Sequence, residues 1–365
     1  MSATRLLLVT DAVGGVWVYS LELARALKPF GIQAVLAVMG PPPNAAQSEQ
    51  ASDFRLIDTG LPLEWLDTSR REIRQAGEAI ARIADREGAD IVQTSSAALL
   101  ADVHFSQPCI AVQHSCVATW WDAVKRTPLP PDFQWRRELV ERGLKRASAI
   151  VAPSIAFAAE TARIYDVPVP VNAVHNGRRA MTFGRVPQGE FVFTAGRLWD
   201  EGKNVATLDA AATRVGIPFQ AAGPTNGPNG ASVRLDHLEG IGEVSATRIA
   251  GLFSARPIYA SAALYEPFGL SVLEAAQARC ALVLSDIPTH RELWDGAAIF
   301  VPASDAEAFA DAIQHLADDP RERQEFGERA RARSQLYAPE RMARAMAEIY
   351  ARVAKPQLHL IAGAA

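Results

Sequence analysis

The feature that most constrains the fold is a strand, a glycine turn, a helix and a second strand at the start of the chain. Residues 6–10 (Leu-Leu-Leu-Val-Thr) form a short apolar run, which is typical of a strand buried on both faces. Gly14 and Gly15 follow, then residues 17–27 with apolar side chains at helical spacing, and a second apolar run at 32–38. This order predicts a βαβ unit whose first turn is the usual ligand crevice of an open parallel sheet. The Gly-x-Gly-x-x-Gly pattern is absent, which disfavours a dinucleotide-binding turn.

Apolar runs of strand length recur along the chain on both sides of residues 181–190, which are predicted to be an interdomain linker. A chain of 365 residues exceeds the usual size of a single core, so two domains are expected. A net charge of −4 gives no reason to expect nucleic acid as a partner. The further predicted strands are 91–94, 108–113, 149–152 and 171–174 in the first half, and 191–196, 217–222, 281–285 and 299–302 in the second.

Helical spacing and capping residues predict helices between these strands. Residues 41–50 are predicted to be a polar, proline-rich loop. The predicted helices are 73–86, 135–146, 155–165, 205–215, 271–279, 305–316, 321–336 and 339–353.

The cysteines and the apolar runs bear on where the protein works. Cys109, Cys116 and Cys280 lie in or beside apolar segments without metal-ligand spacing, which indicates buried thiols in a reducing compartment. The first apolar run is too short for a secretory signal, and no run of about 18 apolar residues would span a membrane. We therefore expect a cytoplasmic protein.

The stretch from Glu266 to Glu274 carries the strongest chemical signal. It lies between a predicted strand and a predicted helix, and Pro267 suits the first turn of a helix. Gly269 allows close approach of the backbone to a ligand, and the free N–H groups of the helix start attract anions. Backbone donors for a phosphate beside carboxylates for sugar hydroxyls fit a nucleotide-sugar site. From spacing alone, an ordinary helix start with a solvated Glu274 is an equal alternative.

This stretch resembles the Glu-x7-Glu motif of family 4 glycosyltransferases, the retaining group with the GT-B fold. The resemblance implies that Glu266 lies at the transferred sugar and that Glu274 binds the ribose of the donor nucleotide. The backbone of Gly269, Leu270 and Ser271 would contact sugar and phosphate.

Other motifs in family order extend the resemblance over nearly the whole chain. The resemblance implies that Gly14 and Gly15 face the donor across the cleft. The alternative is a plain tight turn. Arg197 and Lys203 contact the diphosphate, where a solvated charged loop is the alternative. Gly242 marks the place where the backbone meets the base.

His114 ends a predicted strand, where ligands of parallel sheets usually bind. The family often has a histidine there close to the transferred sugar, which implies a catalytic role for His114. A structural histidine with all its hydrogen bonds made is the alternative.

The GT-B fold implies an α/β protein with two Rossmann-like parallel-sheet domains facing a central cleft. Residues 1–180 would form an N-terminal acceptor-binding domain, and residues 181–338 a C-terminal nucleotide-sugar-binding domain. Residues 339–365 would be a terminal helix and tail that cross back to the first domain. The predicted N-cap Ser154 and the His175-Asn-Gly177 turn also match the family, with His175 in place of its proline.

Residues 119–146 depart from the regular pattern because they mix tryptophans with an excess of basic residues. Such a mixture fits peripheral contact with the inner face of a membrane or an anionic acceptor. The favoured interpretation is an insertion loop followed by a solvated helix at residues 135–146.

The predicted function is transfer of a sugar, with retention, from a nucleotide diphosphate sugar to a glycan, lipid-linked or small-molecule acceptor. A UDP-sugar is favoured and GDP-mannose is the alternative donor. No Asp-x-Asp occurs in the chain, so we expect no metal and no other cofactor. The rival classes are a nucleotide-sugar epimerase of the same fold and a non-catalytic sugar-binding protein.

Overall fold

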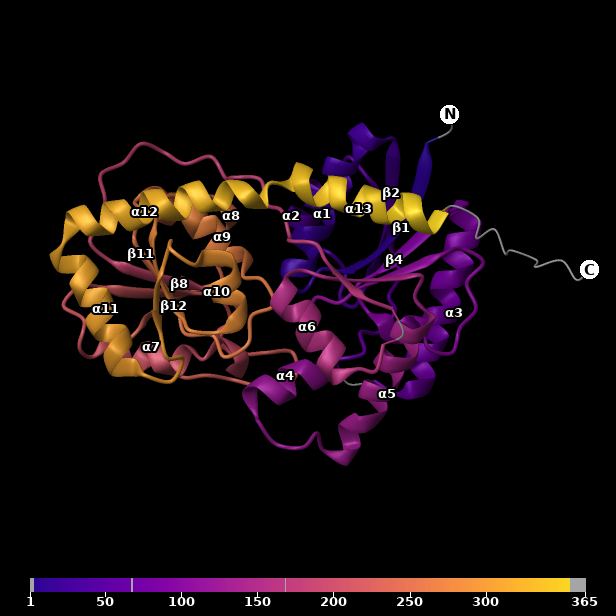
Figure 1. The fold of residues 1–365 in the computed structure, drawn as a ribbon, viewed down its shortest axis with the longest axis horizontal. Helices are drawn as coiled ribbons and strands as arrows, with labels where there is room; N and C mark the ends of the chain where they lie inside the picture. Colours follow the sequence, from indigo (N-terminus) through magenta and orange to yellow (C-terminus); the bar gives the residue numbers. More distant parts are fainter. Residues whose placement is uncertain (1–2, 67, 168, 355–365) are drawn as a thin grey trace, which may run out of the picture.

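The computed structural model describes residues 3–66, 68–167 and 169–354, which form two parallel sheets with helices on both faces (Figure 1). The predicted pair of Rossmann-like domains is therefore confirmed. The first sheet has the order β3-β2-β1-β4-β5-β6-β7, with β1 (Thr4–Asp11), β2 (Ile32–Met39), β3 (Arg55–Asp58), β4 (Ile91–Thr94), β5 (Cys109–Val112), β6 (Ala149–Ala152) and β7 (Val171–Ala173). The second has the order β10-β9-β8-β11-β12-β13, with β8 (Val192–Ala195), β9 (Phe219–Ala222), β10 (Glu239–Gly242), β11 (Ile258–Ser261), β12 (Ala281–Ser285) and β13 (Ile299–Val301).

Helices lie between consecutive strands, three more follow the last strand, and together they cover both faces of each sheet (Figure 1). Those of the first domain are α1 (Gly15–Leu27), α2 (Ala45–Gln50), α3 (Arg70–Glu87), α4 (Val117–Val124), α5 (Pro131–Arg146) and α6 (Ile155–Ile164). Those that follow are α7 (Val205–Ala212), α8 (Ala246–Ser254), α9 (Leu270–Gln277), α10 (Pro288–Trp294), α11 (Ala306–Asp318), α12 (Pro320–Ser334) and α13 (Pro339–Ala354).

Strand β1 shows why the first apolar run lacks polar alternation. It lies between β2 and β4, with Leu7 opposite Val35 and Val92. Leu7 packs with the core on one face of the sheet, and Leu6 packs with the core on the other. Both faces are covered by helices, so both sets of side chains need to be apolar.

Residues 174–191 contain no strand or helix and lead from the first sheet to the second. Helix α13 returns from the second domain and packs on α1 of the first, where Met346 and Tyr350 enter the core (Figure 1). Gly177 lies against the start of α13, where a Cβ would be 2.5 Å from Pro339 Cα. Residues 355–365, which were predicted as part of the terminal helix and tail, lie outside the described residues.

Three local predictions need correction. Residues 41–50 are not wholly a loop, because Asn44 and Gln47 form a capping box that starts α2. The segment predicted as an insertion loop before residue 135 contains α4 and the start of α5, which begins at Pro131. Strand β3 and helices α8 and α10, of four, nine and seven residues, were not predicted.

None of the helices in the described part of the chain is long and apolar enough to cross a bilayer.

Candidate active site at the interdomain cleft

The carboxyl ends of strands from both sheets meet at one cavity of about 540 Å³. Parallel sheets place ligands at this end of their strands. A second hollow, of about 920 Å³, lies at the amino ends of the first sheet, away from all predicted site residues. The cleft cavity is lined from the first domain by Asp11, Gly14, Gly15, Glu64, Trp65, Ser96, His114, Trp120, Trp121, Lys125 and Phe133 among others, and from the second by Arg197, Trp199, Asp200, Glu201, Asn229 and Ala231.

The turn before α9 presents a helix start toward the first domain. Gly269 has φ +88°, a left-handed conformation that glycine adopts at little cost, and α9 begins at the next residue, Leu270. Pro267 therefore precedes the helix, and the prediction that it occupies the first turn is wrong. Across the cleft, a Cβ on Gly15 would lie 3.3 Å from Leu270 Cδ1, so the two glycine turns are close. The space between the two turns lies beside the start of α9, and the free N–H groups of a helix start stabilise an anion.

Lys203 and Glu266 form an ion pair at the edge of this space. The Glu266 side chain is 10% exposed, and both residues line a small pocket with Gly196 and Ser271. Ser271 Oγ accepts a hydrogen bond from the Tyr259 hydroxyl at 2.8 Å, which fixes the first turn of α9. The structure thus brings together the residue predicted at the sugar and a cation predicted at the diphosphate.

Arg197 follows β8 and is held by two contacts within its own loop. Its Nη2 lies 2.9 Å from Asp200 Oδ2, and its guanidinium lies 5.6 Å from the Trp199 ring centroid. Asp200 also accepts a hydrogen bond at 2.9 Å from Trp120 Nε1 of α4, in the other domain. Arg197 therefore lines the cavity in a position fixed by both domains.

Glu274 does not line the cleft cavity or the small pocket. Its Oε1 accepts a hydrogen bond at 2.8 Å from Nε of Arg178, in the linker. Arg178 also contacts Glu22 of α1 at 3.1 Å, so it joins carboxylates from both domains. Burial raises the pKa of Glu274, and the charge of Arg178 opposes that rise.

His114 lies at the floor of the cavity after β5. Its ring packs edge-on against Tyr19 with centroids 4.3 Å apart, and its buried Nε2 has no hydrogen-bond partner among the described residues. Burial lowers the pKa of His114 from 6.5 to about 4, so the imidazole is neutral at physiological pH. A neutral imidazole can exchange a hydrogen bond with a ligand hydroxyl.

Two buried carboxylates on the first-domain side were not singled out from the sequence. Asp11 ends β1, is 8% exposed, and accepts a hydrogen bond at 2.9 Å from the Val13 N–H. Glu64 is 9% exposed and accepts one at 2.9 Å from Ser96 Oγ. Burial raises the pKa of both side chains. The position of Asp11 directly after a strand was the available signal, whereas nothing in the sequence around Glu64 marked it.

Gly242 lies at the carboxyl end of the edge strand β10 with φ +67°. Its carbonyl accepts a hydrogen bond at 2.8 Å from the Gly223 N–H, and Gly223 packs directly on Gly196. Gly242 does not line the cleft cavity, but this contact links it to the turn before Arg197.

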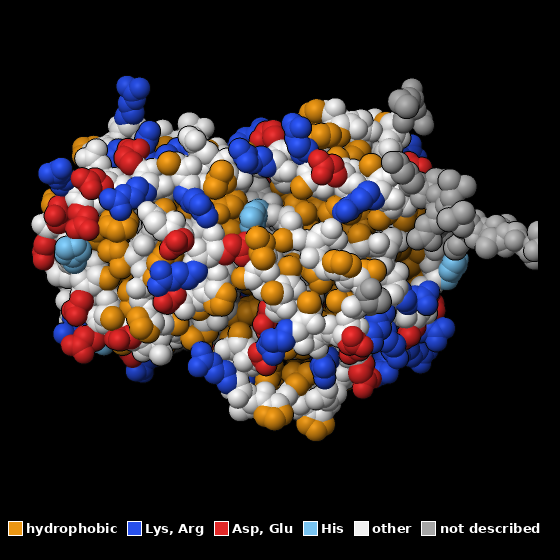
Figure 2. Space-filling view, viewed as in Figure 1, with side chains coloured by type: hydrophobic (Ala, Val, Ile, Leu, Met, Phe, Trp, Pro, Cys, Tyr) orange, Lys and Arg blue, Asp and Glu red, His pale blue; other side chains and the backbone are white. Residues whose placement is uncertain are grey.

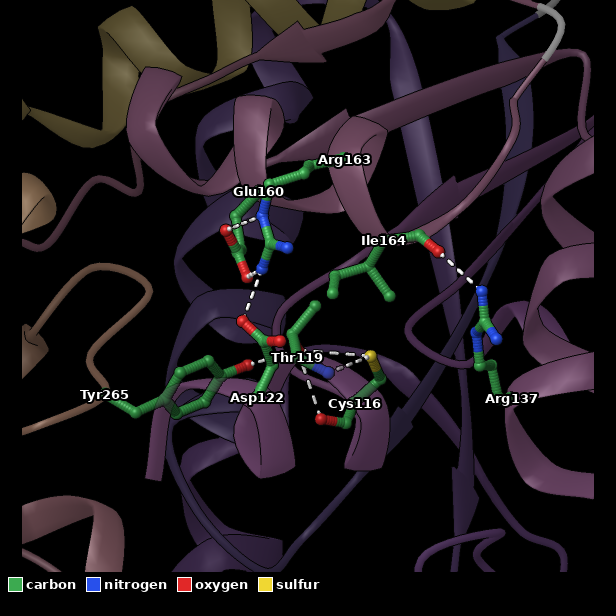
Figure 3. Close-up of polar contacts among 8 residues, drawn as sticks. All are labelled: Cys116, Thr119, Asp122, Arg137, Glu160, Arg163, Ile164 and Tyr265. Atoms are coloured by element: carbon green, nitrogen blue, oxygen red, sulfur yellow. Dashed lines mark hydrogen bonds and ion pairs between the residues drawn. The ribbon is translucent and has the colours of Figure 1, made fainter. Parts of the chain in front are cut away.

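Helix α4 uses the tryptophans of the unusual segment to face the cleft. Trp120 and Trp121 line the cavity, and Lys125 lies 2.5 Å from Glu201 of the second domain. Figure 3 shows Tyr265 reaching from the second domain to Thr119, with hydroxyl oxygens 2.8 Å apart. The start of α4 therefore forms part of the domain interface.

The cations of α5 face solvent with acidic neighbours. Figure 2 shows Lys and Arg side chains gathered near α3 and α5 with Asp and Glu among them. Arg142 pairs with Asp102 at 2.9 Å, and Lys145 pairs with Glu141 at 2.7 Å.

The domains are also joined behind the cavity, at the start of α6. Glu292 of α10 accepts hydrogen bonds from the N–H groups of Ile155 and Ala156, at 2.9 and 2.7 Å. It also contacts His175 Nε2 at 2.7 Å. Burial alone would raise the pKa of Glu292, but these hydrogen bonds outweigh it and lower the pKa. The predicted N-cap Ser154 donates to Pro267 O at 2.8 Å, which ties α6 to the turn before α9.

Two family descriptions match the chain, one for each domain. Residues 13–179 match Glycosyltransferase Family 4, and residues 232–333 match Glycosyl transferases group 1. No curated protein sequence matches significantly. The chain belongs to the family 4 glycosyltransferases of the GT-B type, as its Glu-x7-Glu motif suggested.

Solved structures share the fold over nearly the whole chain. Sucrose-phosphate synthase from Thermosynechococcus elongatus has 18% identity and a TM-score of 0.77, covering 96% of this chain and 98% of that one. HepE from Anabaena, in complex with UDP-glucose, has 15% identity and a TM-score of 0.76, covering 95% and 99%. The lipopolysaccharide glycosyltransferase WaaG has 13% identity and a TM-score of 0.69, covering 95% and 99%.

Proposed function

We propose that the protein transfers a hexosyl group, with retention, from a nucleotide diphosphate sugar to a hydroxyl of a glycan, lipid-linked or small-molecule acceptor. The observation that carries this proposal is the Lys203–Glu266 pair beside the start of α9, opposite the Gly14–Gly15 turn. A UDP-sugar is the favoured donor, and GDP-mannose is the alternative. The UDP-glucose bound to HepE supports this preference.

In the proposed reaction, the acceptor oxygen forms a bond to the anomeric carbon on the face from which the diphosphate leaves. The bond between that carbon and the phosphate oxygen breaks, and its electron pair stays on the nucleoside diphosphate. The departing phosphate takes the proton of the acceptor hydroxyl. Arg197, Lys203 and the N–H groups at the start of α9 stabilise the charge that grows on that phosphate.

Glu266 and His114 have roles at the sugar in this proposal. Glu266 accepts hydrogen bonds from sugar hydroxyls while Lys203 holds its carboxylate in place. Neutral His114 hydrogen-bonds a hydroxyl through Nε2. Glu274 acts on the nucleotide side, where its contact with Arg178 sets its orientation.

The deciding experiment compares Glu266→Gln with the unchanged protein. The substitution keeps the shape of the side chain but removes the charge, so sugar transfer falls while calorimetric affinity for UDP persists. Normal turnover in Glu266→Gln would contradict the proposed site. Release of UDP from UDP-sugars, without formation of an epimer, separates the transferase from the rival epimerase.

The proposed reaction is independent of metal, because two cations and a helix start occupy the place where the diphosphate charge develops. Among the described residues, no three His, Cys, Asp or Glu side chains cluster as metal ligands. Turnover is expected to survive EDTA. Loss of turnover in EDTA, with recovery on adding Mg²⁺ or Mn²⁺, would refute this part of the proposal.

A further inference from the structure

The charges around the cleft cavity are unevenly balanced. Four carboxylates line it, and the two from the second domain are paired: Asp200 with Arg197, and Glu201 with Lys125. The two from the first domain, Asp11 and Glu64, form no ion pair with any residue in the described part of the chain.

Asp11 and Glu64 are held by neutral donors only. Asp11 Oδ1 accepts from the Val13 N–H, and Oδ2 has no hydrogen-bond partner among residues 3–66, 68–167 and 169–354. Glu64 accepts from the Ser96 hydroxyl. Burial raises the pKa of both carboxyls, and the charges of Arg197 near Asp11 and of Arg136 near Glu64 offset this rise only in part. The first-domain wall thus offers acceptors for hydroxyl groups, and the cation that it contributes to the cavity lining, Lys125, is paired with Glu201.

The buried His114 Nε2 adds a further unpartnered polar atom to the same floor. The rest of the cavity is rich in aromatic side chains, which offer flat apolar faces beside these few polar groups. These aromatic residues are Trp65, Trp120, Trp121, Phe133 and Trp199.

We propose that the acceptor is an uncharged, hydroxyl-rich compound, a sugar or simple glycoside, and that Asp11 and Glu64 exclude acceptors carrying phosphate or carboxylate. The inference rests on the proposed function, which it deepens by naming the acceptor class. A phosphorylated acceptor would place its charge beside two unpaired carboxyls, and like charges at close range oppose binding. The two cations that line the cavity do not relieve this, because Arg197 is assigned to the donor diphosphate and Lys125 is paired with Glu201.

The test compares matched acceptor pairs with one donor: methyl glycosides of glucose, galactose, mannose and N-acetylglucosamine, each against its 6-phosphate. The unchanged protein should use the best neutral member with a kcat/KM at least about tenfold above that of its phosphate, as like-charge repulsion predicts. A preference for the phosphorylated partner would overturn the proposal.

Substitutions of Asp11 and Glu64 test whether these carboxylates cause the preference for neutral over phosphorylated acceptors. Asp11→Asn and Glu64→Gln keep side-chain shape, and together they should reduce the neutral-to-phosphate ratio about tenfold or more. Glu138→Gln makes the same chemical change on the exposed surface of α5, where Glu138 pairs with Arg70, and should leave the ratio unchanged. An unchanged ratio in the double variant would overturn the assignment.

Calorimetric UDP binding and slow donor hydrolysis, measured on the same samples, separate this proposal from the proposed function. If the protein binds the donor but prefers anionic acceptors, the proposal of an uncharged acceptor is wrong and the proposed function stands. Failure to bind or hydrolyse any nucleotide sugar removes the proposed function itself.

Discussion

The two walls of the cleft are built on the same kind of sheet but carry their charges differently. On the second-domain wall, each named cation has a carboxylate partner, as in Arg197–Asp200 and Lys203–Glu266. On the first-domain wall, Asp11 and Glu64 are buried without an ion-pair partner among the described residues, beside tryptophans and a neutral His114. The contrast fits our proposals that one wall stabilises a diphosphate and the other binds an uncharged polyol.

The difference also shows how far a motif identifies a site. The second-domain wall is encoded in contiguous stretches, residues 196–203 and 266–274, which a reader of the sequence can find. The first-domain wall is assembled from separate stretches after β1, β3, β4 and β5 and from α4, of which the Gly14–Gly15 turn and His114 were found from the sequence. Substitutions on each wall can break or sharpen this contrast.

The largest effect is expected for Lys203→Ala on the donor wall. It removes a cation that offsets leaving-group charge and leaves Glu266 without its partner. Turnover should fall about 10²–10³-fold, the usual cost of losing one such stabiliser. Lys28→Ala, which breaks a surface pair with Asp53, is the matched control and should retain normal kcat. A kcat for Lys203→Ala close to that of the control would end the donor-wall assignment.

The pH dependence of stability tests whether His114, on the first-domain side of the cleft, is neutral. The pKa of His114 is about 4 in the folded protein and ordinarily 6.5, so the unfolded chain takes up the proton first as pH falls. The free energy of unfolding should therefore decrease by up to about 3 kcal/mol between pH 6.5 and pH 4.

In His114→Asn the free energy of unfolding should decrease less steeply with falling pH. Part of the decrease should remain, because the pKa of buried His290 is also lowered. His104→Asn, at an exposed position, serves as the control and should retain the full slope. Urea unfolding at a series of pH values measures it, and equal slopes in all three proteins would show that His114 is not held neutral by burial.

Glu274→Gln tests the carboxylate of the donor motif that lies outside both pockets. The change removes the charge that would strengthen the hydrogen bonds from the ribose hydroxyls, so the affinity for UDP should fall by about 1.5–3 kcal/mol, the scale of hydrogen bonds to charged groups. Calorimetry with UDP measures it, with Glu266→Gln as the comparison that keeps nucleotide affinity. Wild-type affinity for UDP in Glu274→Gln would exclude a role for Glu274 in nucleotide binding. Its remaining role would be to join Arg178 and Glu22 in the link between the domains.

The smallest effect is expected for Trp120→Phe. It keeps an aromatic ring in the cavity but deletes the bond to Asp200, at a cost of about 1 kcal/mol. Hydrogen exchange should speed up both in α4 and at residues 200–203. In Trp121→Phe, whose lost bond to Thr127 lies within the first domain, exchange should speed up only near α4. Equal patterns in the two variants would mean that Trp120 does not join the walls.

The sequence predicted most of the strands, the two domains and the donor motif. Strands such as β1 and β12 were recognisable because burial on both faces leaves an uninterrupted apolar run, a property of the local sequence. Gly269 was singled out because glycine lets the backbone approach a ligand, and the structure places it in a left-handed turn directly before α9. The elements β3, α8 and α10 were missed; each has at most nine residues, so little sequence carries its pattern.

The docking of the two domains determined the contacts between them and the burial of the cleft residues. Arg178 meets Glu274 across 96 residues of sequence, and Trp120 meets Asp200 across 80. No local propensity encodes such a pair, since it exists only when two separately built sheets face each other. Burial of Asp11 and Glu64, and hence the direction of their pKa shifts, likewise follows from the packing around the cleft. The sequence alone determined where a donor phosphate would be expected, and the tertiary structure determined which side chains surround the cleft cavity.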